Sequence, residues 1–108
     1  MSIKLNITEY APSLIPVDPG IYIFRHNKRI LYIGKASNLR KRLASYFRLR
    51  VSEKVRQLRT EATTLEILVL KSEVEALIKE AELIKRHVPK FNLAMRDDKN
   101  YAYVAVTN

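Results

Sequence analysis

Two tyrosines lie in short apolar segments whose spacing could bring their phenol groups together. Tyr22 ends the tripeptide that begins at Gly20, and Tyr32 begins the tripeptide that ends at Gly34. The residues between these segments are polar, so the pattern predicts two antiparallel strands joined as a hairpin. With a connecting loop of about three or five residues, Tyr22 is expected directly opposite Tyr32, whereas a slip of one residue would place the phenols on opposite faces. The alternative is an ordinary hairpin in which both tyrosines only pack.

Most of the side chains that could bind an anion lie in one stretch of the chain. Between Lys28 and Arg56 there are ten Lys and Arg residues and one acidic residue, Glu53, so this stretch carries the whole net charge of +9. Such a concentrated block indicates an anionic partner, most commonly a phosphodiester backbone. An anionic membrane is a weaker alternative, because the stretch lacks a long apolar helix face. The predicted DNA-binding residues are Lys28, Arg29, Lys35, Arg40, Lys41, Arg42, Arg48 and Arg50.

Length and composition restrict the elements that can position these residues. A chain of 108 residues predicts one domain with a single modest core. It contains no cysteine, which excludes disulfides and thiolate zinc sites and fits a reducing compartment. No apolar segment is long enough for a membrane span. Residues 1–18 are expected to form an irregular lead-in, because Pro12 and Pro16 disfavour helix, and residues 19–108 are expected to form the domain.

The hydrophobic pattern predicts a mixed α/β domain in which a small, largely antiparallel sheet is flanked by helices, in the order β-β-α-α-β-α-β. The third strand is almost continuously apolar, which favours a central position buried on both faces. The clearest helix begins at a capping box formed by Ser72 and Glu75 and ends before Pro89. Residues 90–100 are predicted to be a loop. The expected strands are Ile21–Phe24, Ile30–Ile33, Leu65–Leu70 and Tyr101–Val106; the expected helices begin near Ser37 or Asn38, Ser52 and Ser72, and the buried stripe of the last is Val74, Leu77, Ile78, Ala81, Ile84 and Val88.

The order of these motifs resembles the GIY-YIG nuclease family, which takes its name from the two tripeptides. Further segments are similar to the UvrC branch of that family, in which the domain is the N-terminal nuclease domain of an excinuclease subunit. Ala102 departs from the pattern of that branch, which more often has proline there. The matching segments are Pro19-Gly20-Ile21-Tyr22, Tyr32-Ile33-Gly34-Lys35-Ala36, Arg42-Leu43-Ala44-Ser45-Tyr46-Phe47, Glu80-Ala81-Glu82-Leu83-Ile84-Lys85, Pro89-Lys90-Phe91-Asn92 and Arg96-Asp97-Asp98-Lys99 with Tyr101.

The resemblance implies that Tyr22 and Tyr32 line the active site and that one of them helps to deprotonate an attacking water. A free phenol has a pKa near ~10, so nearby cations such as Lys35 are expected to lower it. Among three consecutive basic residues, the resemblance selects Arg42 as the one that stabilises charge on a phosphate oxygen. Tyr46 follows four residues later, on the same helix face, as a phosphate or catalytic-shell contact.

The resemblance also indicates a metal ligand and a supporting amide. Glu80 lies at the border of the apolar stripe, and a single carboxylate suits magnesium or manganese, which complete their shells with water and phosphate oxygens. One divalent ion is expected, because no acidic pair or histidine cluster indicates a second. Glu73, Glu75 and Glu82 are expected to be cap or surface charges, and Asn92 is implied to orient groups around metal and phosphate. The expected catalytic set is Tyr22, Tyr32, Lys35, Arg42, Tyr46, Glu80 and Asn92.

Together these features predict a metal-dependent DNA endonuclease domain that hydrolyses a phosphodiester by water attack. By resemblance, the reaction is the 3′-side incision of nucleotide excision repair in the cytoplasm. Partners are then DNA and other excision-repair proteins (UvrB-like), reached through parts of a longer chain. The alternatives are an inactive DNA-binding module of the same fold, a stand-alone UvrC-related repair nuclease, and a homing or restriction-type member.

Overall fold

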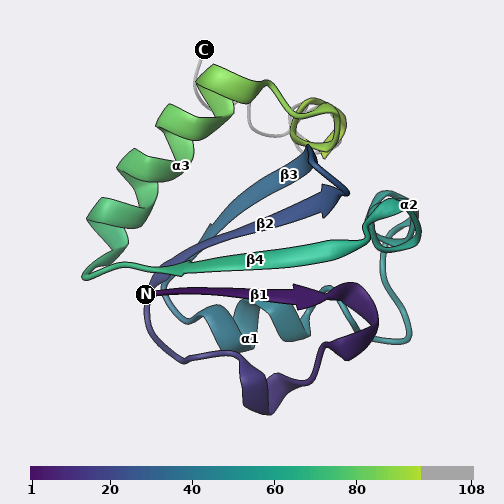
Figure 1. Ribbon diagram of the computed structural model, residues 1–108, viewed down its shortest axis with the longest axis horizontal. Helices are drawn as coiled ribbons and strands as arrows, with labels where there is room; N and C mark the ends of the chain where they lie inside the picture. The colour runs from purple at the N-terminus through teal and green to yellow at the C-terminus, as the bar shows by residue number, and fades with distance from the viewer. Residues whose placement is uncertain (96–108) are drawn as a thin grey trace.

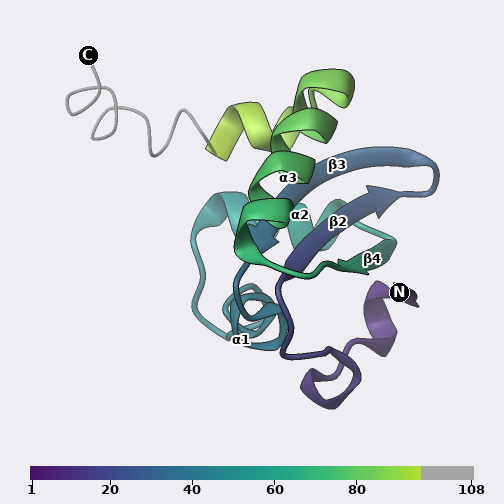
Figure 2. The ribbon, with the colours of Figure 1, turned by 90° about the vertical axis from the view of Figure 1, so that its left-hand side faces the viewer.

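The computed structural model describes residues 1–95 and contains a four-stranded antiparallel sheet with the strand order β1-β4-β2-β3 (Figure 1). Helix α3 covers one face of the sheet, and α1 lies on the other (Figures 1 and 2). The expected mixed α/β fold is confirmed, while the expected strand Tyr101–Val106 lies outside the described residues. The elements are β1 (Ser2–Asn6), the 3-10 turns η1 (Ile7–Glu9) and η2 (Pro12–Leu14), β2 (Gly20–His26), β3 (Arg29–Ala36), α1 (Leu39–Ala44), α2 (Glu53–Glu61), β4 (Thr64–Val69) and α3 (Glu73–His87).

The N-terminal segment is part of the sheet, so the expectation of an irregular lead-in over residues 1–18 is wrong for its first residues. Strand β1 pairs antiparallel with β4 and forms an edge of the sheet. This pairing gives β4 the interior position that its sequence predicted. Burial along β4 nevertheless alternates, with Leu65 and Ile67 buried and Glu66 on the other face, so β4 is not buried on both faces as expected.

A β-bulge decides which side chains share a face in the β2–β3 hairpin. The turn is only two residues long, and Asn27 adopts the left-handed region (φ 55°) that asparagine tolerates. Arg25 pairs with Ile30 but Phe24 pairs with Tyr32, so Leu31 is an extra residue in β3. Tyr22 therefore lies opposite Gly34, two positions from Tyr32, and not opposite Tyr32 as expected. Without the bulge, the two-residue turn would place Tyr22 and Tyr32 on opposite faces.

Each predicted helix begins at a side-chain cap. Asn38 accepts a hydrogen bond from the backbone N–H of Lys41 at the start of α1, and Ser52 and Ser72 cap α2 and α3 in the same way. Helix α1 is short, so Tyr46 lies beyond its end. Residues 90–95 form another helical turn where a loop was predicted.

Helix α3 packs on the sheet through a different face from the one predicted. Ala76 is buried, and Leu83 and Ile84 pack with it against Ile21, Ile23 and Ile33 of the sheet. In contrast, Val74, Leu77, Ile78 and Val88 are 64%, 51%, 63% and 54% exposed, and Ala81 is exposed as well, so the predicted buried stripe is wrong except at Ile84. The helix is rotated toward the side that carries Glu80. The apolar pattern alone could not show this, because apolar residues occur on both sides of the helix.

Candidate active site

Three tyrosines from three different elements meet on the α1 face of the sheet. Tyr22 of β2 and Tyr46 after α1 are joined by a hydrogen bond of 2.8 Å between their hydroxyl oxygens. Tyr46 donates a further hydrogen bond of 3.3 Å to the hydroxyl of Tyr32 in β3, and Arg42 Nε donates one of 3.3 Å to the Tyr22 hydroxyl. Arg42 and Tyr46 thus both contact the Tyr22 hydroxyl, but they do not share a helix face as predicted, because α1 ends before Tyr46. Tyr46 is the central member of this tyrosine cluster.

The hydrogen bonds of the cluster have one direction. A guanidinium only donates, so the Tyr22 oxygen accepts from Arg42. The single hydroxyl proton of Tyr46 is donated to Tyr32, so in the hydrogen bond between Tyr22 and Tyr46 the donor is Tyr22. The donors therefore run from Arg42 through Tyr22 and Tyr46 to Tyr32, whose own hydroxyl proton is left for a group outside the cluster.

Gly34 leaves the space in which the Tyr22 ring lies. A Cβ at position 34 would lie far inside contact distance of the Tyr22 ring carbon Cζ and of its hydroxyl oxygen. Gly34 and Tyr22 are direct partners across the hairpin. The Tyr22 ring can lie where it does only because residue 34 has no side chain. Gly20 is equally confined, because a Cβ there would overlap the backbone oxygen of Leu68.

We expect Gly34→Ala to displace Tyr22 and so to disturb the whole cluster. The added methyl cannot fit without moving a fully buried ring, and overpacking of this kind costs about 1–3 kcal/mol. Thermal unfolding of the variant should show this loss. Combining it with Tyr22→Ala, which removes the ring, should cancel most of the effect of the methyl group. If Gly34→Ala alone leaves the melting temperature unchanged, the proposed contact is wrong.

Burial, and not the nearby cations, controls the ionisation of two of these tyrosines. Burial raises the pKa of Tyr22, and the neighbouring Tyr32 adds to this, although the hydrogen bond from Arg42 opposes it. Burial also raises the pKa of Tyr46. The expectation that cations lower the pKa is therefore wrong for Tyr22. The hydrogen bond to Tyr22 raises the pKa of Arg42, which keeps its guanidinium charged.

A cleft of about 640 Å³ lies beside the cluster and is lined by residues of β3, α1 and α3. Tyr22 and Tyr32 contribute to its wall from the sheet, and Lys35 follows at the end of β3. Glu80 reaches the cleft from α3, on the opposite side from the basic residues of α1. Most of the predicted site residues are thereby brought together, from segments far apart in sequence. The lining residues are Tyr22, Tyr32, Gly34, Lys35, Ala36, Ser37, Asn38, Lys41, Arg42, Ser45, Arg48, Glu73 and Glu80.

Asn92 supports the site from outside the cleft. Its Oδ1 accepts a hydrogen bond of 2.8 Å from the backbone N–H of Ile33, and its Nδ2 donates one of 2.8 Å to the carbonyl of the same residue. Within the described residues β3 has no neighbouring strand on this side, and Asn92 pairs with its backbone there, between Tyr32 and Gly34. Both ends of the amide are used in this clasp, so its contribution in this structure is to hold β3. Its role in orienting groups around metal and phosphate stays a prediction.

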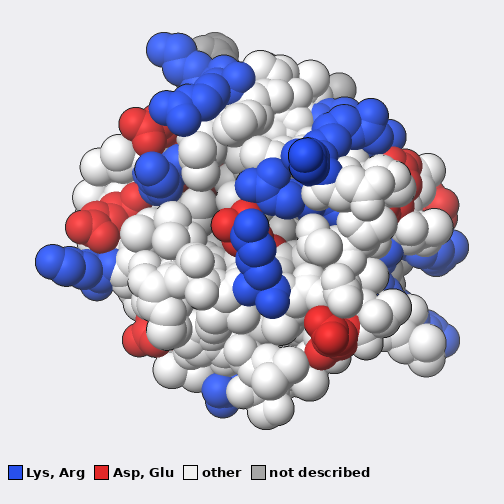
Figure 3. Space-filling model, viewed as in Figure 1, with Lys and Arg blue, Asp and Glu red and all other residues white. Residues whose placement is uncertain are grey.

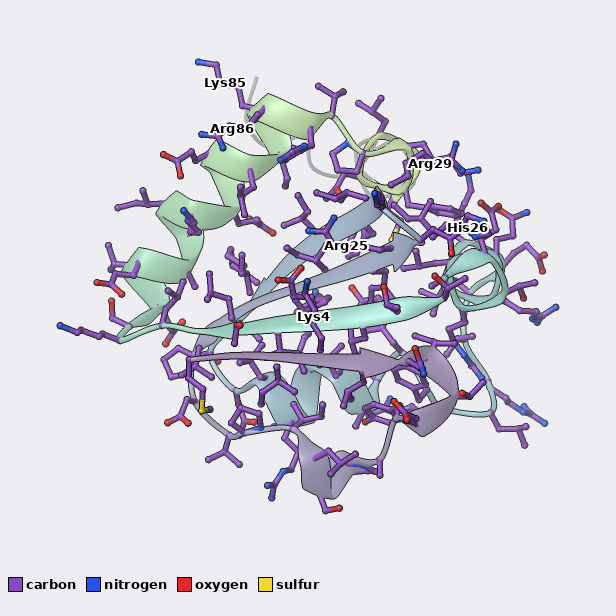
Figure 4. All side chains as sticks on the ribbon, in the orientation of Figure 1. Lys4, Arg25, His26, Arg29, Lys85 and Arg86 are labelled. Atoms are coloured by element: carbon purple, nitrogen blue, oxygen red, sulfur yellow. The ribbon has the colours of Figure 1, made fainter. Side chains whose placement is uncertain are left out.

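The predicted basic block does not form one surface. Lys35, Lys41, Arg42 and Arg48 line the cleft, but Arg40 donates through Nε to the carbonyl of Ile15. Lys28 and Arg29 lie at the turn of the β2–β3 hairpin. Gly20 and Gly34 lie at or near the other end of these two strands. On the face that carries α3, basic side chains also gather over the strands and the end of α3 (Figure 3). The residues labelled in this view are Lys4, Arg25, His26, Arg29, Lys85 and Arg86 (Figure 4).

Some lining residues were not selected from the sequence. Ser37 and Ser45 are small polar residues with no distinctive spacing. Glu73, which was expected to be a cap or surface charge, also lines the cleft. Its distance of two helical turns from Glu80 places both on one side of α3, which is the signal that could have identified it.

The donor groups of the cleft fit a hard divalent cation. Glu80 supplies a carboxylate, and the cleft is large enough for water and a phosphate group beside it. Within residues 1–95 there is no group of three or more His, Cys, Asp or Glu side chains that could enclose a metal. A magnesium site with one main protein ligand and several waters needs no such enclosure.

Solved structures of similar fold include GIY-YIG endonuclease domains. The magnesium-bound N-terminal endonuclease domain of UvrC from Thermotoga maritima matches with a TM-score of 0.70 and 45% identity, covering 74% of this chain and 89% of that chain. The family model for the UvrC-like GIY-YIG domain matches residues 18–93, so the chain belongs to this family.

Curated relatives carry the same segment as a small part of a longer protein. UvrABC system protein C of Lawsonia intracellularis is 47% identical over 93 residues, and that of Thermus thermophilus is 43% identical over 94. These matches cover 83% and 87% of this chain but only 15% and 16% of the relatives. The expected family and nuclease class are confirmed.

Proposed function

We propose that this chain is a metal-dependent endonuclease domain that hydrolyses a phosphodiester of DNA. The observation that supports this most directly is the cleft, which the carboxylate of Glu80 lines together with the cations Lys35 and Arg42 and with Tyr22 and Tyr32. A phosphodiester needs this combination, because its hydrolysis requires charge stabilisation and proton transfer at the same phosphorus.

Each side chain is assigned a role from its position. Arg42 and Lys35 bind the non-bridging oxygens of the phosphate and stabilise the charge that develops there. Tyr32 is the end of the hydrogen-bonded cluster, and its oxygen accepts from Tyr46. We therefore assign proton transfer from the attacking water to Tyr32. Tyr22 and Tyr46, which burial keeps protonated, position Tyr32 and Arg42.

Glu80 would hold a magnesium or manganese ion together with water and the substrate phosphate. Such an ion supplies Lewis-acid stabilisation of the phosphate and the leaving oxygen. The Thermotoga maritima domain is described as bound to its catalytic cation, magnesium. Point mutants of that domain replace three tyrosines by phenylalanine, at the same spacing as Tyr22, Tyr32 and Tyr46, and one asparagine by alanine. These comparisons support the assignment of the tyrosines.

The biological reaction follows from the relatives. Because they are named as part of the UvrABC system, we propose that this domain makes the 3′-side incision of nucleotide excision repair and acts with other proteins of that system. The cytoplasmic location stays a prediction; within the described residues, no helix could cross a membrane. A DNA-binding module without catalysis would need the basic residues of the cleft but not Glu80 with the tyrosine cluster.

The assay that tests this function is nicking of supercoiled plasmid by the chain in magnesium. We expect nicked circles in magnesium or manganese and none after a chelator is added. Binding without nicking, under conditions in which DNA saturates the protein, would favour the non-catalytic module.

DNA affinity should depend steeply on salt and should come mainly from the cleft. Each neutralised phosphate contributes about −0.9 to the slope of log affinity against log salt concentration, so several contacts give a slope of roughly −3 or steeper. Replacing Lys41 and Arg48 by glutamate should weaken binding and make the slope shallower by about one for each contact.

The matched control for this measurement reverses two charges at the hairpin turn, Lys28→Glu and Arg29→Glu. These positions lie at the far end of the sheet, so their effect should be smaller. Equal losses for both pairs would show that the DNA does not lie in the cleft, and a slope near zero would contradict phosphate binding altogether.

A further inference from the structure

A second cavity shares a wall with the cleft. Its volume is about 280 Å³, and Tyr32, Arg42 and Ser45 line both cavities. Tyr32, which is 5% exposed, and Arg42 therefore lie next to both cavities. The other lining residues of the second cavity are Tyr46, Ser52, Lys54, Val55 and Met95.

The two cavities differ in chemistry. The cleft contains four Lys and Arg side chains, together with Glu73 and Glu80. The second cavity is walled by the phenol rings of Tyr32 and Tyr46 and by Val55 and Met95, with Ser52 and Lys54 as polar groups. Aromatic and apolar walls with a few polar groups are typical of a site for an organic ring.

A polynucleotide also places a charged group beside an aromatic one, because each phosphate is followed by a sugar and an aromatic base. A phosphate bound between Lys35 and Arg42 would therefore have a nucleoside directly beside it. The second cavity has Arg42, which is assigned to the phosphate, in common with the cleft. Its walls can contact a base or sugar without reading base identity.

We propose that the second cavity binds the nucleoside next to the scissile phosphate. This inference rests on the proposed function of the cleft. The nucleoside contacts the wall formed by Tyr32, Val55 and Met95, and Arg42 contacts the phosphate at the junction. Occupation of the cavity then determines which phosphate of the strand lies beside Glu80. A nucleoside can enter only when it has left the base stack, so the site selects a locally unpaired strand.

The test compares small probes by NMR, without metal, on the chain labelled in its methyl groups and backbone amides. The probes are inorganic phosphate, thymidine 5′-phosphate and thymidine 3′-phosphate. Phosphate should shift signals of Lys35 and its neighbours. At least one nucleotide should in addition shift the methyl signals of Val55 and Met95, and should bind about fivefold or more tightly than phosphate, the lower end of what stacking a base provides.

Two variants separate the cavity from general effects. Val55→Phe fills the cavity, so the variant should bind a nucleotide no more tightly than it binds inorganic phosphate, while phosphate binding itself remains. The control Gln57→Phe adds the same ring to an exposed position of α2 and should change neither the affinity for the nucleotide nor the affinity for phosphate. The folding of both is checked by their amide spectra.

The outcomes distinguish this inference from the proposed function. If phosphate shifts the cleft but both nucleotides bind no better and leave Val55 and Met95 unchanged, the nucleoside site is wrong and the phosphate site stands. If neither phosphate nor a nucleotide shifts the cleft, the phosphate site is wrong as well. The proposal is also overturned if the Val55→Phe variant still binds a nucleotide more tightly than phosphate.

Discussion

Glu80→Gln should bind DNA at least as tightly as the parent and cut it at least ~10²-fold more slowly. Glutamine has nearly the size and helix propensity of glutamate, so α3 should keep its place on the sheet. The substitution removes the negative charge that a hard divalent cation requires. It also removes repulsion between the cleft and phosphate, so affinity measured without metal should hold or rise slightly. A plasmid nicking assay beside a binding titration measures both quantities.

The matched control for this variant is Glu82→Gln on the same helix. Glu82 is exposed and pairs with Lys79 at 3.4 Å on the surface of α3, so its replacement should leave nicking unchanged. Adding a chelator to the parent should have the same effect as Glu80→Gln. A Glu80→Gln variant that nicks at the parent rate would falsify the assignment of Glu80 as metal ligand, and so would parent activity that survives the chelator.

Tyr32→Phe should abolish nicking and cost less stability than Tyr22→Phe, because the Tyr32 hydroxyl has one partner within the described residues and the Tyr22 hydroxyl has two. Tyr32 is the last acceptor of the cluster, so loss of its hydroxyl removes the proposed proton transfer, an effect of about 10²-fold or more. The Tyr22 hydroxyl has two partners in a buried site, Arg42 and Tyr46. Its loss leaves these groups unsatisfied and should cost about 1–3 kcal/mol of unfolding free energy.

Measuring melting temperature and rate per folded molecule on the same samples separates chemistry from packing. Tyr10→Phe is the matched control, because Tyr10 stacks on Phe47 outside the cluster and its hydroxyl oxygen makes no hydrogen bond within the described residues. It should keep the parent rate. If Tyr32→Phe also keeps the parent rate, the tyrosines are structural and proton transfer belongs to another group.

Features that depend on local sequence were predictable. The apolar segments around Tyr22 and Tyr32, with polar residues between them, indicated the hairpin. Ser37 or Asn38, Ser52 and Ser72 marked the starts of three helices that the structure confirms. Each of these signals acts over one turn or one strand, so it needs no knowledge of the rest of the fold. The resemblance then selected Glu80 and Arg42 from several equivalent charged residues, which no local signal could do.

Features that depend on packing between distant segments were missed. Strand β1 is short, and its position at the sheet edge depends on pairing with β4, far along the chain. The contact face of α3 depends on the shape of the sheet, which accepts Ala76 and leaves Leu77 exposed. Likewise, the direction in which the Tyr22 pKa shifts depends on how completely the ring is buried. Burial raises this pKa more than the nearby cations, which the sequence did indicate, lower it.

The sequence by itself determined that two tyrosines, a basic segment and a carboxylate would be available to one domain. Only the tertiary structure decided that they meet. The bulge at Leu31 shifts the register by one residue and so brings Tyr32 to the face of Tyr22, and Gly34 leaves room for the ring. Leu31 and Tyr32 can both be buried in the same core cluster because the extra residue breaks the strict alternation of the strand. Strand alternation is a local rule, but the free energy that overrides it comes from burying both side chains in the assembled core.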